Sequence, residues 1–476
     1  MKGEGPMSGE TFRIDTDSMG EVKVPSWAYW GAQTQRAVDN FCVSDLRIPA
    51  PLVRALGLVK QVAASVNGDL GLLEPGMSEA IGRAAREVAE GKWDAHFPID
   101  VFQTGSGTSW NMNANEVIAN RANVLLGAPL GAKKPVHPND HVNRGQSSND
   151  VVPTVISIAD RLQLNGLSAA LDTLTRSLAR KAVEFADVLK IGRTHLQDAV
   201  PMTLGQEFSG YARQMERAGQ LLLQCAPALE ELAIGGTAIG TGINTHPEFA
   251  RRVTAAIAEL TGVPFRPAGN TFEAIAARDS QVELMGVLNS IAVRLMKIAN
   301  DLRLLSSGPR TGLAEISLPS LQPGSSIMPG KVNPVILEMT IQAAARVMGS
   351  SLSVSIGGQS GPLELNMMLP LIAWESLSSL SLLERTCSAL AERCIDGIAA
   401  DAARSREWIE RSLALVTPLA LKIGYDRAAQ LAHKALAENL TVREVVIAEG
   451  VLSAEEADRI LDPRSMLGPQ RKHADG

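Results

Sequence analysis

The chain has 476 residues, with 45 Lys and Arg against 51 Asp and Glu, and a formal net charge of −6. Hydrophobic residues make up 45% and charged residues 20%, as in ordinary soluble globular proteins. The mildly acidic balance argues against nucleic-acid or anionic-membrane binding. No apolar run approaches the roughly 20 residues of a membrane-spanning helix. Residues 1–10 lack the apolar segment of a signal peptide.

Four cysteines, Cys42, Cys225, Cys387 and Cys394, are scattered along the chain without a CxxC pair. This spacing is neither a disulfide framework nor a zinc-ligand set, so we expect a protein of the reducing cytoplasm. Cys387 and Cys394 stand in an apolar helical stretch, so we expect both in the core.

In chain order, the first part of the sequence predicts short helices and loops, with strand-like alternation only in short pieces such as residues 21–24. Long apolar periods with spacings of three and four follow over residues 164–189, 204–232 and 284–305. Such periods predict helices of about 25 to 30 residues in coiled-coil-like packing. Pro227 should kink the second of them.

Two further helices are predicted after Pro334 and Pro370, where proline suits a helix start. The fold class is therefore all-α, with an N-terminal helical domain (1–146), a central five-helix bundle (147–403) and a small C-terminal helical domain (404–476). Two capping boxes, Thr441 with Glu444 and Ser453 with Glu456, mark short C-terminal helices. The apolar seams could be an intramolecular core alone, but seams this long favour association into oligomers.

Four loops are dense in Gly, Ser, Thr, Asn and His. Residues 103–113 offer Ser106 and Thr108 beside flexible glycines, an arrangement suited to an anion. Residues 146–150 precede the first long helix, whose free N–H groups favour a carboxylate or phosphate, although plain N-capping would also explain them. His195 lies in the polar loop 192–198 and could move protons near neutral pH. Residues 323–334 combine Ser325, Lys331 and Asn333 in a long loop of the kind that is usually functional.

Metal and nucleotide sites are disfavoured. His137 and His141 are four residues apart, but Pro138 makes a helix through both unfavourable. A Walker lysine motif and a strand–GxGxxG–helix unit are both lacking. We expect no metal and no organic cofactor.

Taken together, the loops resemble the fumarase/aspartase superfamily, and most closely the class II (iron-independent) fumarases. Residues 324–333 read Gly-Ser-Ser-Ile-Met-Pro-Gly-Lys-Val-Asn and match the superfamily signature GSSxMPxKxN without a gap. Further motifs follow in the family's order at residues 30–35, 66–71, 102–108, 137–140, 191–198, 235–242 and 423–426. His195 and Gly330 resemble fumarases, since aspartases usually carry Gln and Ala there. Trp110 departs from the fumarase pattern, which commonly has a small polar residue at that position.

The resemblance implies three mainly helical domains, a homotetramer built on the central bundles, and active sites shared between three subunits. It also implies reversible hydration of fumarate to (S)-malate, a reaction of the tricarboxylic acid cycle. The family assigns the C3 base to the serine matching Ser325 and pairs the histidine matching His195 with the glutamate matching Glu338. Lys331 and Asn333 would stabilise the doubly charged aci-carboxylate intermediate.

The remaining site residues implied by the resemblance bind carboxylates. For the substrate they are Ser106, Gly107, Thr108, Ser147, Ser148, Asn149, Thr194, Ser326 and Val332. A second dicarboxylate site would be formed by His137, Pro138, Asn139 and Asp140. The competing hypotheses are an aspartate ammonia-lyase, another fumarate-releasing lyase, and a non-catalytic helical scaffold. His195 opposes the first, and the intact set of polar loop residues opposes the scaffold.

Overall fold

The computed structural model describes residues 11–468 of the chain, so the expectation for residues 1–10 lies outside the described residues. The fold is mainly helical, as the sequence predicts, and the strands in this part of the chain form short two-stranded sheets. No helix in the described range combines the length and the apolarity that crossing a membrane requires. All four cysteines are unpaired, and Cys387 and Cys394 are buried as expected.

The chain divides into two compact units. The first contains the described residues up to Ser168 together with Gln220–Ser290 and Arg346–Leu383. The second contains Ala169–Gly219, Ile291–Ala345 and the described residues from Glu384 onward. Several long helices therefore begin in one unit and end in the other.

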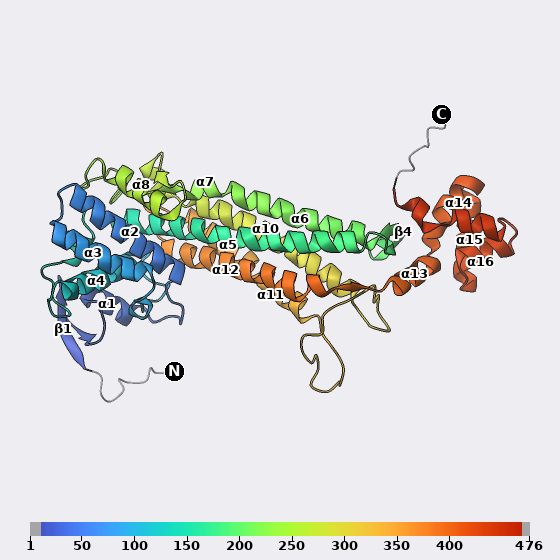
Figure 1. Ribbon diagram of the computed structural model, residues 1–476, viewed down its shortest axis with the longest axis horizontal. Helices are drawn as coiled ribbons and strands as arrows, with labels where there is room; N and C mark the ends of the chain where they lie inside the picture. Colours follow the sequence, from blue (N-terminus) through green and yellow to red (C-terminus); the bar gives the residue numbers. More distant parts are fainter. Residues whose placement is uncertain (1–10, 469–476) are drawn as a thin grey trace. The chain divides into compact units, whose positions relative to one another are not determined.

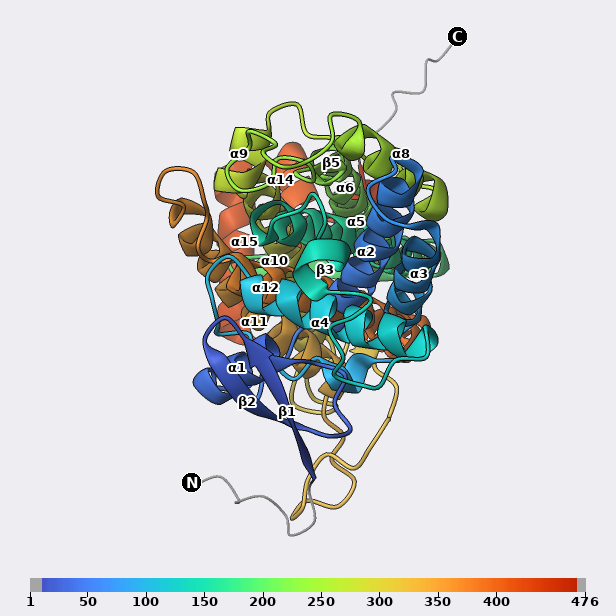
Figure 2. The ribbon, with the colours of Figure 1, turned by 90° about the vertical axis from the view of Figure 1, so that its left-hand side faces the viewer.

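The first unit begins with an antiparallel hairpin whose second strand covers the alternation expected at residues 21–24. Figure 2 shows this hairpin beside α1. Its elements up to the first long helix are β1 (Phe12–Asp17), β2 (Gly20–Pro25), α1 (Ala32–Asn40), α2 (Ala50–Asp69), α3 (Pro75–Ala89), η1 (Asp94–His96), α4 (Thr108–Leu125) and η2 (Pro138–Val142).

Helices α2, α3 and α4 lie side by side in this unit (Figure 1). Their apolar faces build its core, in which Leu52, Leu56, Ile81 and Ile118 are fully buried. α4 differs from an ordinary amphipathic helix because it also buries Asn111, Asn113 and Asn115. Buried amides must find hydrogen-bond partners, so α4 already points to a polar network.

Five long helices occupy the segments with long apolar periods or proline starts. They are α5 (Ser148–Glu184), α6 (Leu204–Gln224), α10 (Asp279–Leu305), α11 (Val335–Gln359) and α12 (Leu369–Arg393). The kink expected at Pro227 takes the form of a one-residue interruption. α6 ends at Gln224, Cys225 keeps φ and ψ values of −78° and −18°, and the four-residue α7 (Ala226–Leu229) follows.

Polar contacts between these helices occur in both units. In the first, the carboxylate of Asp160 on α5 accepts hydrogen bonds from Ser376 Oγ of α12 (2.8 Å) and from Gln281 Nε2 of α10 (3.3 Å). In the second, Tyr211 on α6 donates to Asp301 Oδ2 of α10 at 2.9 Å. The first unit also contains β5 (Glu231–Leu232), α8 (Phe249–Thr261), β6 (Arg266–Pro267) and α9 (Thr271–Ala276).

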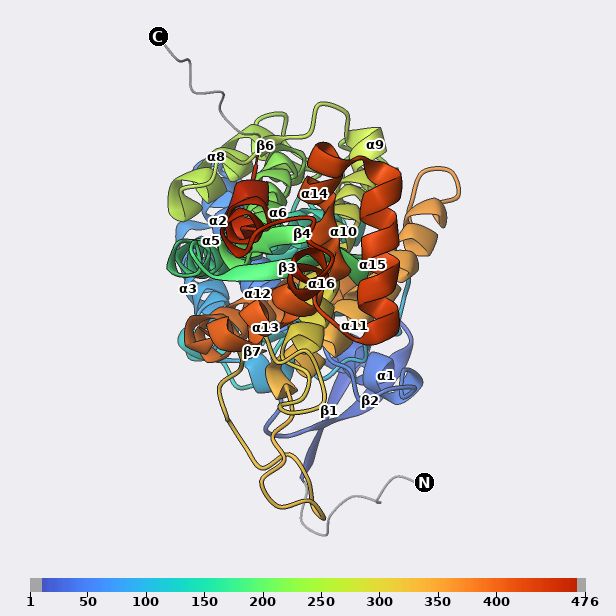
Figure 3. The ribbon, with the colours of Figure 1, turned by 90° about the vertical axis from the view of Figure 1, so that its right-hand side faces the viewer.

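The second unit contains two small sheets and the C-terminal helices, which share an apolar core that includes Leu419, Leu431 and Val446. Both predicted capping boxes are present, at the starts of α16 and α17. Figure 3 shows α14, α15 and α16 grouped together. The elements are β3 (Leu189–Thr194), β4 (Gln197–Thr203), β7 (Ile316–Ser317), η3 (Ile395–Gly397), β8 (Ala399–Ala400), α13 (Ala402–Arg411), η4 (Leu413–Leu415), α14 (Val416–Ile423), α15 (Tyr425–Glu438), α16 (Val442–Ala448), α17 (Ala454–Ile460) and η5 (Pro463–Met466).

Candidate active site

The loop before α4 is held close to the segment that leads into α12. Leu369 N–H donates to Gly105 O at 3.0 Å, and a Cβ on Gly105 would lie 2.1 Å from Met367 O. Only glycine permits this approach. Gly107 caps α4 with a φ of 70°, and the hydroxyls of Ser106 and Thr108 lie 2.8 Å apart. The predicted anion-binding hydroxyls therefore stand together at a helix N-terminus.

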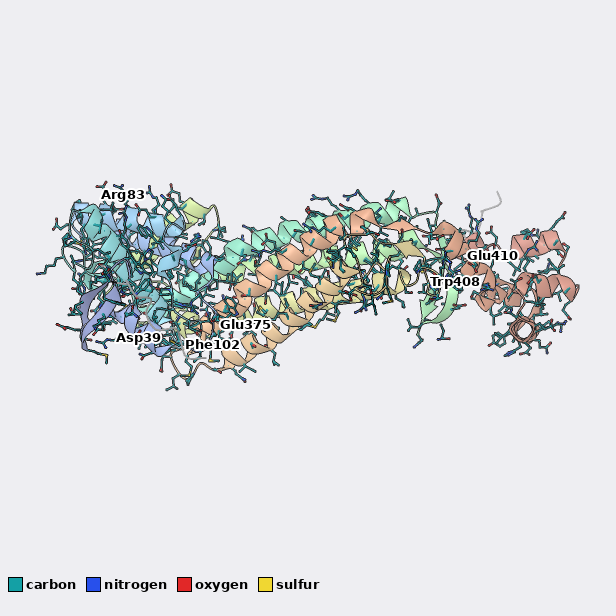
Figure 4. All side chains as sticks on the ribbon, turned by 90° about the horizontal axis from the view of Figure 1, so that it is seen from below. Asp39, Arg83, Phe102, Glu375, Trp408 and Glu410 are labelled. Atoms are coloured by element: carbon teal, nitrogen blue, oxygen red, sulfur yellow. The ribbon has the colours of Figure 1, made fainter. Side chains whose placement is uncertain are left out.

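Two aromatic residues flank this loop. Phe102, which precedes it, is exposed (Figure 4). Trp110, which departs from the fumarase pattern, is 1% exposed and belongs to the apolar core of the first unit. Its Nε1 is buried without a hydrogen-bond partner among the described residues.

Residues 147–149 lie at the start of α5, as predicted. Ser147 Oγ accepts from Asn149 N–H at 3.2 Å, and Asn149 Nδ2 donates to Ala238 O at 2.8 Å. Asp150 fixes this turn, since its carboxylate accepts N–H groups of Ser147, Gly235 and Thr237 at 2.9 Å each. Burial raises the pKa of Asp150 to about 6 although these donors favour the charged form.

Asn111 on α4 forms hydrogen bonds with the N-terminus of α5 and with the segment before it. Its Nδ2 donates to Ser148 Oγ at 2.9 Å and to Asn143 Oδ1 at 3.2 Å. One amide on α4 therefore contacts both the segment that follows η2 and the N-terminus of α5.

The His137 loop forms one π-helical turn, η2. His137 is its N-cap, and its Nδ1 lies 3.2 Å from Asp140 Oδ2, while its backbone N–H donates to His141 Nδ1 at 2.8 Å. The turn contains His141 but not His137, so no helix runs through both histidines, as expected. Pro138 is the first residue of the turn, where the absent N–H is not needed. Pro138 is half-buried, whereas Asn139 and Asp140 are exposed.

In the second unit, His195 forms the tip of the β3–β4 hairpin. His195 and Leu196 have φ values of 56° and 60°, a left-handed conformation that non-glycine residues seldom adopt. Such strain persists where the surroundings enforce it, and it concentrates at functional sites. Thr194 and His195 are exposed in the chain.

The signature loop also lies in the second unit. Ser325 Oγ accepts hydrogen bonds from the backbone N–H groups of Ile327 (3.3 Å) and Met328 (3.0 Å). The loop is closed by Gly324 N–H donating to Lys331 O and by Asn333 Nδ2 donating to Gly324 O, both at 2.7 Å. Two donors directed at one hydroxyl oxygen would stabilise negative charge on it.

The remaining residues of this region are open to solvent in the chain. Ser326, Lys331 and Val332 are exposed, and Glu338 is half-buried in the first turn of α11. Among the described residues, no hydrogen bond or ion pair joins the side chains of His195 and Glu338, although the resemblance pairs them.

Sequence reasoning missed the residues that support these loops: Lys60, Asn111, Asn143, Gln146, Arg193 and Glu315. One signal was present in the alternating asparagines at 111, 113 and 115. Asparagine is a poor helix former, so three of them inside a predicted helix indicate a buried polar role.

Comparison with known proteins gives consistent results over nearly the whole chain. The family described as "Lyase" matches residues 20–349, and the family described as "Fumarase C C-terminus" matches residues 415–468. The chain is 51% identical over 458 residues to "Fumarate hydratase class II" of Nitrosomonas europaea, covering 96% of this chain and 99% of that protein. It is 50% identical over 466 residues to the mitochondrial fumarate hydratase of Rattus norvegicus, covering 97% and 92% of the two chains.

A solved structure agrees with these relatives. The class II fumarase from Schistosoma mansoni superposes with a TM-score of 0.93 at 39% identity, and the match covers 97% of this chain and all of that one. Sequence similarity, fold similarity and the loops described above therefore lead to the same conclusion. The chain belongs to the class II fumarate hydratase family of lyases.

Proposed function

We propose that this protein catalyses the reversible hydration of fumarate to (S)-malate. The supporting structural observation is the pair of N–H groups that Ile327 and Met328 donate to Ser325 Oγ. A serine hydroxyl is a weak base at its ordinary pKa, so deprotonation at C3 of malate requires a surrounding that stabilises the alkoxide. The two N–H groups supply such a surrounding, and Ser325 is the C3 base in this proposal.

Removal of the C3 proton leaves a carbanion whose charge moves into the adjacent carboxylate. Lys331 lies six residues from Ser325 in the same closed loop and has no ion-pair partner within residues 11–468. We assign to Lys331 and Asn333 the stabilisation of this aci-carboxylate. His195, oriented by Glu338, provides for protonation of the departing hydroxyl, which leaves as water.

Ser106, Gly107, Thr108, Ser147, Ser148, Asn149, Thr194, Ser326 and Val332 bind the substrate carboxylates in this proposal. The helix N-termini at α4 and α5 support this role because their free N–H groups favour anions. His137, Pro138, Asn139 and Asp140 would form the second dicarboxylate site.

His195 and Glu338 are not paired within one chain, so we propose that they pair between copies in a homotetramer. The exposed side chains of His195 and Lys331 agree with this assembly, because a partner subunit would cover them. A cytoplasmic location agrees with the four unpaired cysteines.

Ultraviolet absorbance tests the function, because fumarate absorbs through its conjugated double bond. With purified protein we expect absorbance to rise with (S)-malate and to stay constant with L-aspartate. His195→Asn should lower kcat by about 100-fold or more. Asparagine tolerates a positive φ, so this variant preserves the hairpin turn.

His433→Asn is the matched control, since His433 is exposed on α15 and should leave the rate unchanged. Turnover of L-aspartate alone would overturn the proposed function and support an ammonia-lyase.

A further inference from the structure

Lys60 on α2 is fully buried, with 0% of its surface exposed, and it takes no part in the mechanism above. Its Nζ donates to Asn143 Oδ1 and to Gln146 Oε1, both at 2.9 Å. Burial lowers its pKa to about 7, with the nearby Asp150 carboxylate opposing the shift. Burying an amine costs free energy unless hydrogen bonds or an opposite charge compensate for the lost water. Both acceptors belong to the segment that leads into the substrate loop 147–149.

A lysine side chain fixes the direction of the hydrogen bonds around it. The ammonium carries three N–H donors and no acceptor. Asn143 and Gln146 must therefore turn their amide oxygens toward Lys60. Asn143 Oδ1 also accepts from Asn111 Nδ2 and Asn115 Nδ2, both at 3.2 Å. Because Asn143 Oδ1 accepts, Asn111 and Asn115 turn their NH₂ groups toward it.

The same donor-to-acceptor direction holds for the next hydrogen bond, from Asn111 to Ser148. Asn111 Nδ2 donates to Ser148 Oγ at 2.9 Å, while Asn111 Oδ1 is buried without a partner among the described residues. With the amide reversed, Asn111 would accept the single proton of Ser148, and the serine would present lone pairs to a ligand. In the observed direction the serine oxygen is the acceptor, so its proton remains free to donate to an anion.

We propose that Lys60 is a positioning residue that sets this chain of hydrogen bonds so that Ser148 donates its proton to a substrate carboxylate. The inference rests on the proposed function, in which Ser148 binds a carboxylate. It adds a residue outside the substrate loop to those that binding requires. Lys60, a cation on α2, determines whether the Ser148 hydroxyl donates or accepts.

Two substitutions of Asn143 separate direction from packing. Both substitutions remove the hydrogen bond that Asn143 Nδ2 donates to Gln146 O at 3.1 Å, so the difference between them reports the acceptor alone. Asn143→Asp retains oxygens that accept from Lys60 and Asn111, and we expect its KM for fumarate within about threefold of the unmodified protein. Asn143→Leu has no acceptor and releases Asn111. We expect it to raise KM, and the inhibition constant of succinate, about tenfold or more, with kcat changed less than about threefold. Succinate is a useful probe because it has both carboxylates but no reacting double bond.

Lys60→Met tests the lysine directly, with Lys181→Met as control. Lys181 is also a buried lysine that hydrogen-bonds a backbone carbonyl, Ile398 O, but it has no link to Ser148. We expect only Lys60→Met to raise KM, again about tenfold. Combined with Ser148→Ala, Lys60→Met should add no further increase, because it acts through that hydroxyl.

An equal rise in KM for Asn143→Leu and Asn143→Asp would overturn the inference, and so would full additivity of Lys60→Met with Ser148→Ala. If Lys60→Met does not fold, the KM values of Asn143→Asp and Asn143→Leu still test the inference. Calorimetry with succinate separates the two proposals. A protein that binds succinate without hydrating fumarate would refute the proposed function, while the affinity ratios of the variants would still test Lys60. Absence of both turnover and succinate binding would overturn both.

Discussion

Arg193 Nη1 donates a hydrogen bond of 2.8 Å to Glu315 Oε1, and the Glu315 side chain is fully buried. Glu315 Oε2 lies 3.2 Å from Lys190 Nζ, near enough for an ion pair but without hydrogen-bond geometry. Lys190 and Arg193 both belong to strand β3, whose end carries Thr194 and His195. One carboxylate therefore holds the strand that presents the proposed catalytic histidine in a strained turn.

Replacing Glu315 by Gln should weaken this support. The change leaves Arg193 without its charge partner, and breaking a buried ion pair typically costs about 3–5 kcal/mol. We expect a lower melting temperature and a kcat reduced at least about tenfold at a temperature where the variant remains folded. Calorimetry and the absorbance assay measure the two effects.

Asp396→Asn provides the comparison, since Asp396 forms an exposed pair with Arg180 in the same unit. Exposed pairs contribute roughly 0–1 kcal/mol, so neither stability nor rate should change much. A Glu315→Gln variant that is destabilised yet retains full kcat would limit Glu315 to a structural role.

Gly324 allows the signature loop to close. A Cβ at this position would lie 2.5 Å from Lys331 O and 2.7 Å from Asn333 N, closer than real Cβ contacts. Gly324→Ala should separate the two ends of the loop and displace Ser325, lowering kcat/KM by about 100-fold. The loop is largely exposed, so the free energy of unfolding should change by less than about 1 kcal/mol.

Gly76→Ala serves as the matched glycine substitution, because a Cβ there meets nothing within 4 Å in α3. Activity should be unaffected by it. Normal kinetics in Gly324→Ala would show that closure of the loop is not required for catalysis.

Much of the fold could be predicted from the sequence, because it depends on local patterns. Periods of three and four placed the long helices, and the two capping boxes located α16 and α17. The β3–β4 hairpin was missed, since its turn consists of His195 and Leu196, not the Asn and Gly that favour positive φ. The residues proposed for chemistry were identified from motif resemblance. Their supports, such as Lys60 and Glu315, were not, because each acts on a loop distant in sequence and only the folded chain brings them together.

Asp160 predicts a pH dependence of stability. Burial raises its pKa to about 7, from an ordinary value near 4, while Ser376, Gln281 and the charge of Arg278 act in the opposite direction. The folded state therefore binds more protons than the unfolded state between about pH 4 and 7, and the free energy of unfolding falls as pH rises through that window. A shift of about three units corresponds to at most about 4 kcal/mol.

Asp160→Asn removes this titration but leaves the other ionisable groups present. The stability of the variant minus that of the unmodified protein should become more favourable to the variant from pH 5 to 8, whatever its offset at pH 5. Denaturant unfolding at several pH values measures this difference. Asp172→Asn, at an exposed position on the same helix, is the control, and we expect its stability difference from the unmodified protein to stay constant over this pH range. A constant difference for Asp160→Asn as well would contradict the raised pKa.

Sharing of active sites between copies of the chain can be tested by complementation. If His195 and Ser325 of one site come from different chains, inactive variants should complement each other. We would mix His195→Asn and Ser325→Ala chains in equal amounts, dissociate them and reassemble them. Random assembly gives both native residues in roughly a quarter of the sites, so about a quarter of the unmodified activity should return. Mixing the variants without dissociation is the control and should give none. If reassembly of a mixed tetramer is verified by mass and activity is still absent, His195 and Ser325 of each site come from the same chain, and the proposed pairing of His195 with Glu338 between copies loses its support.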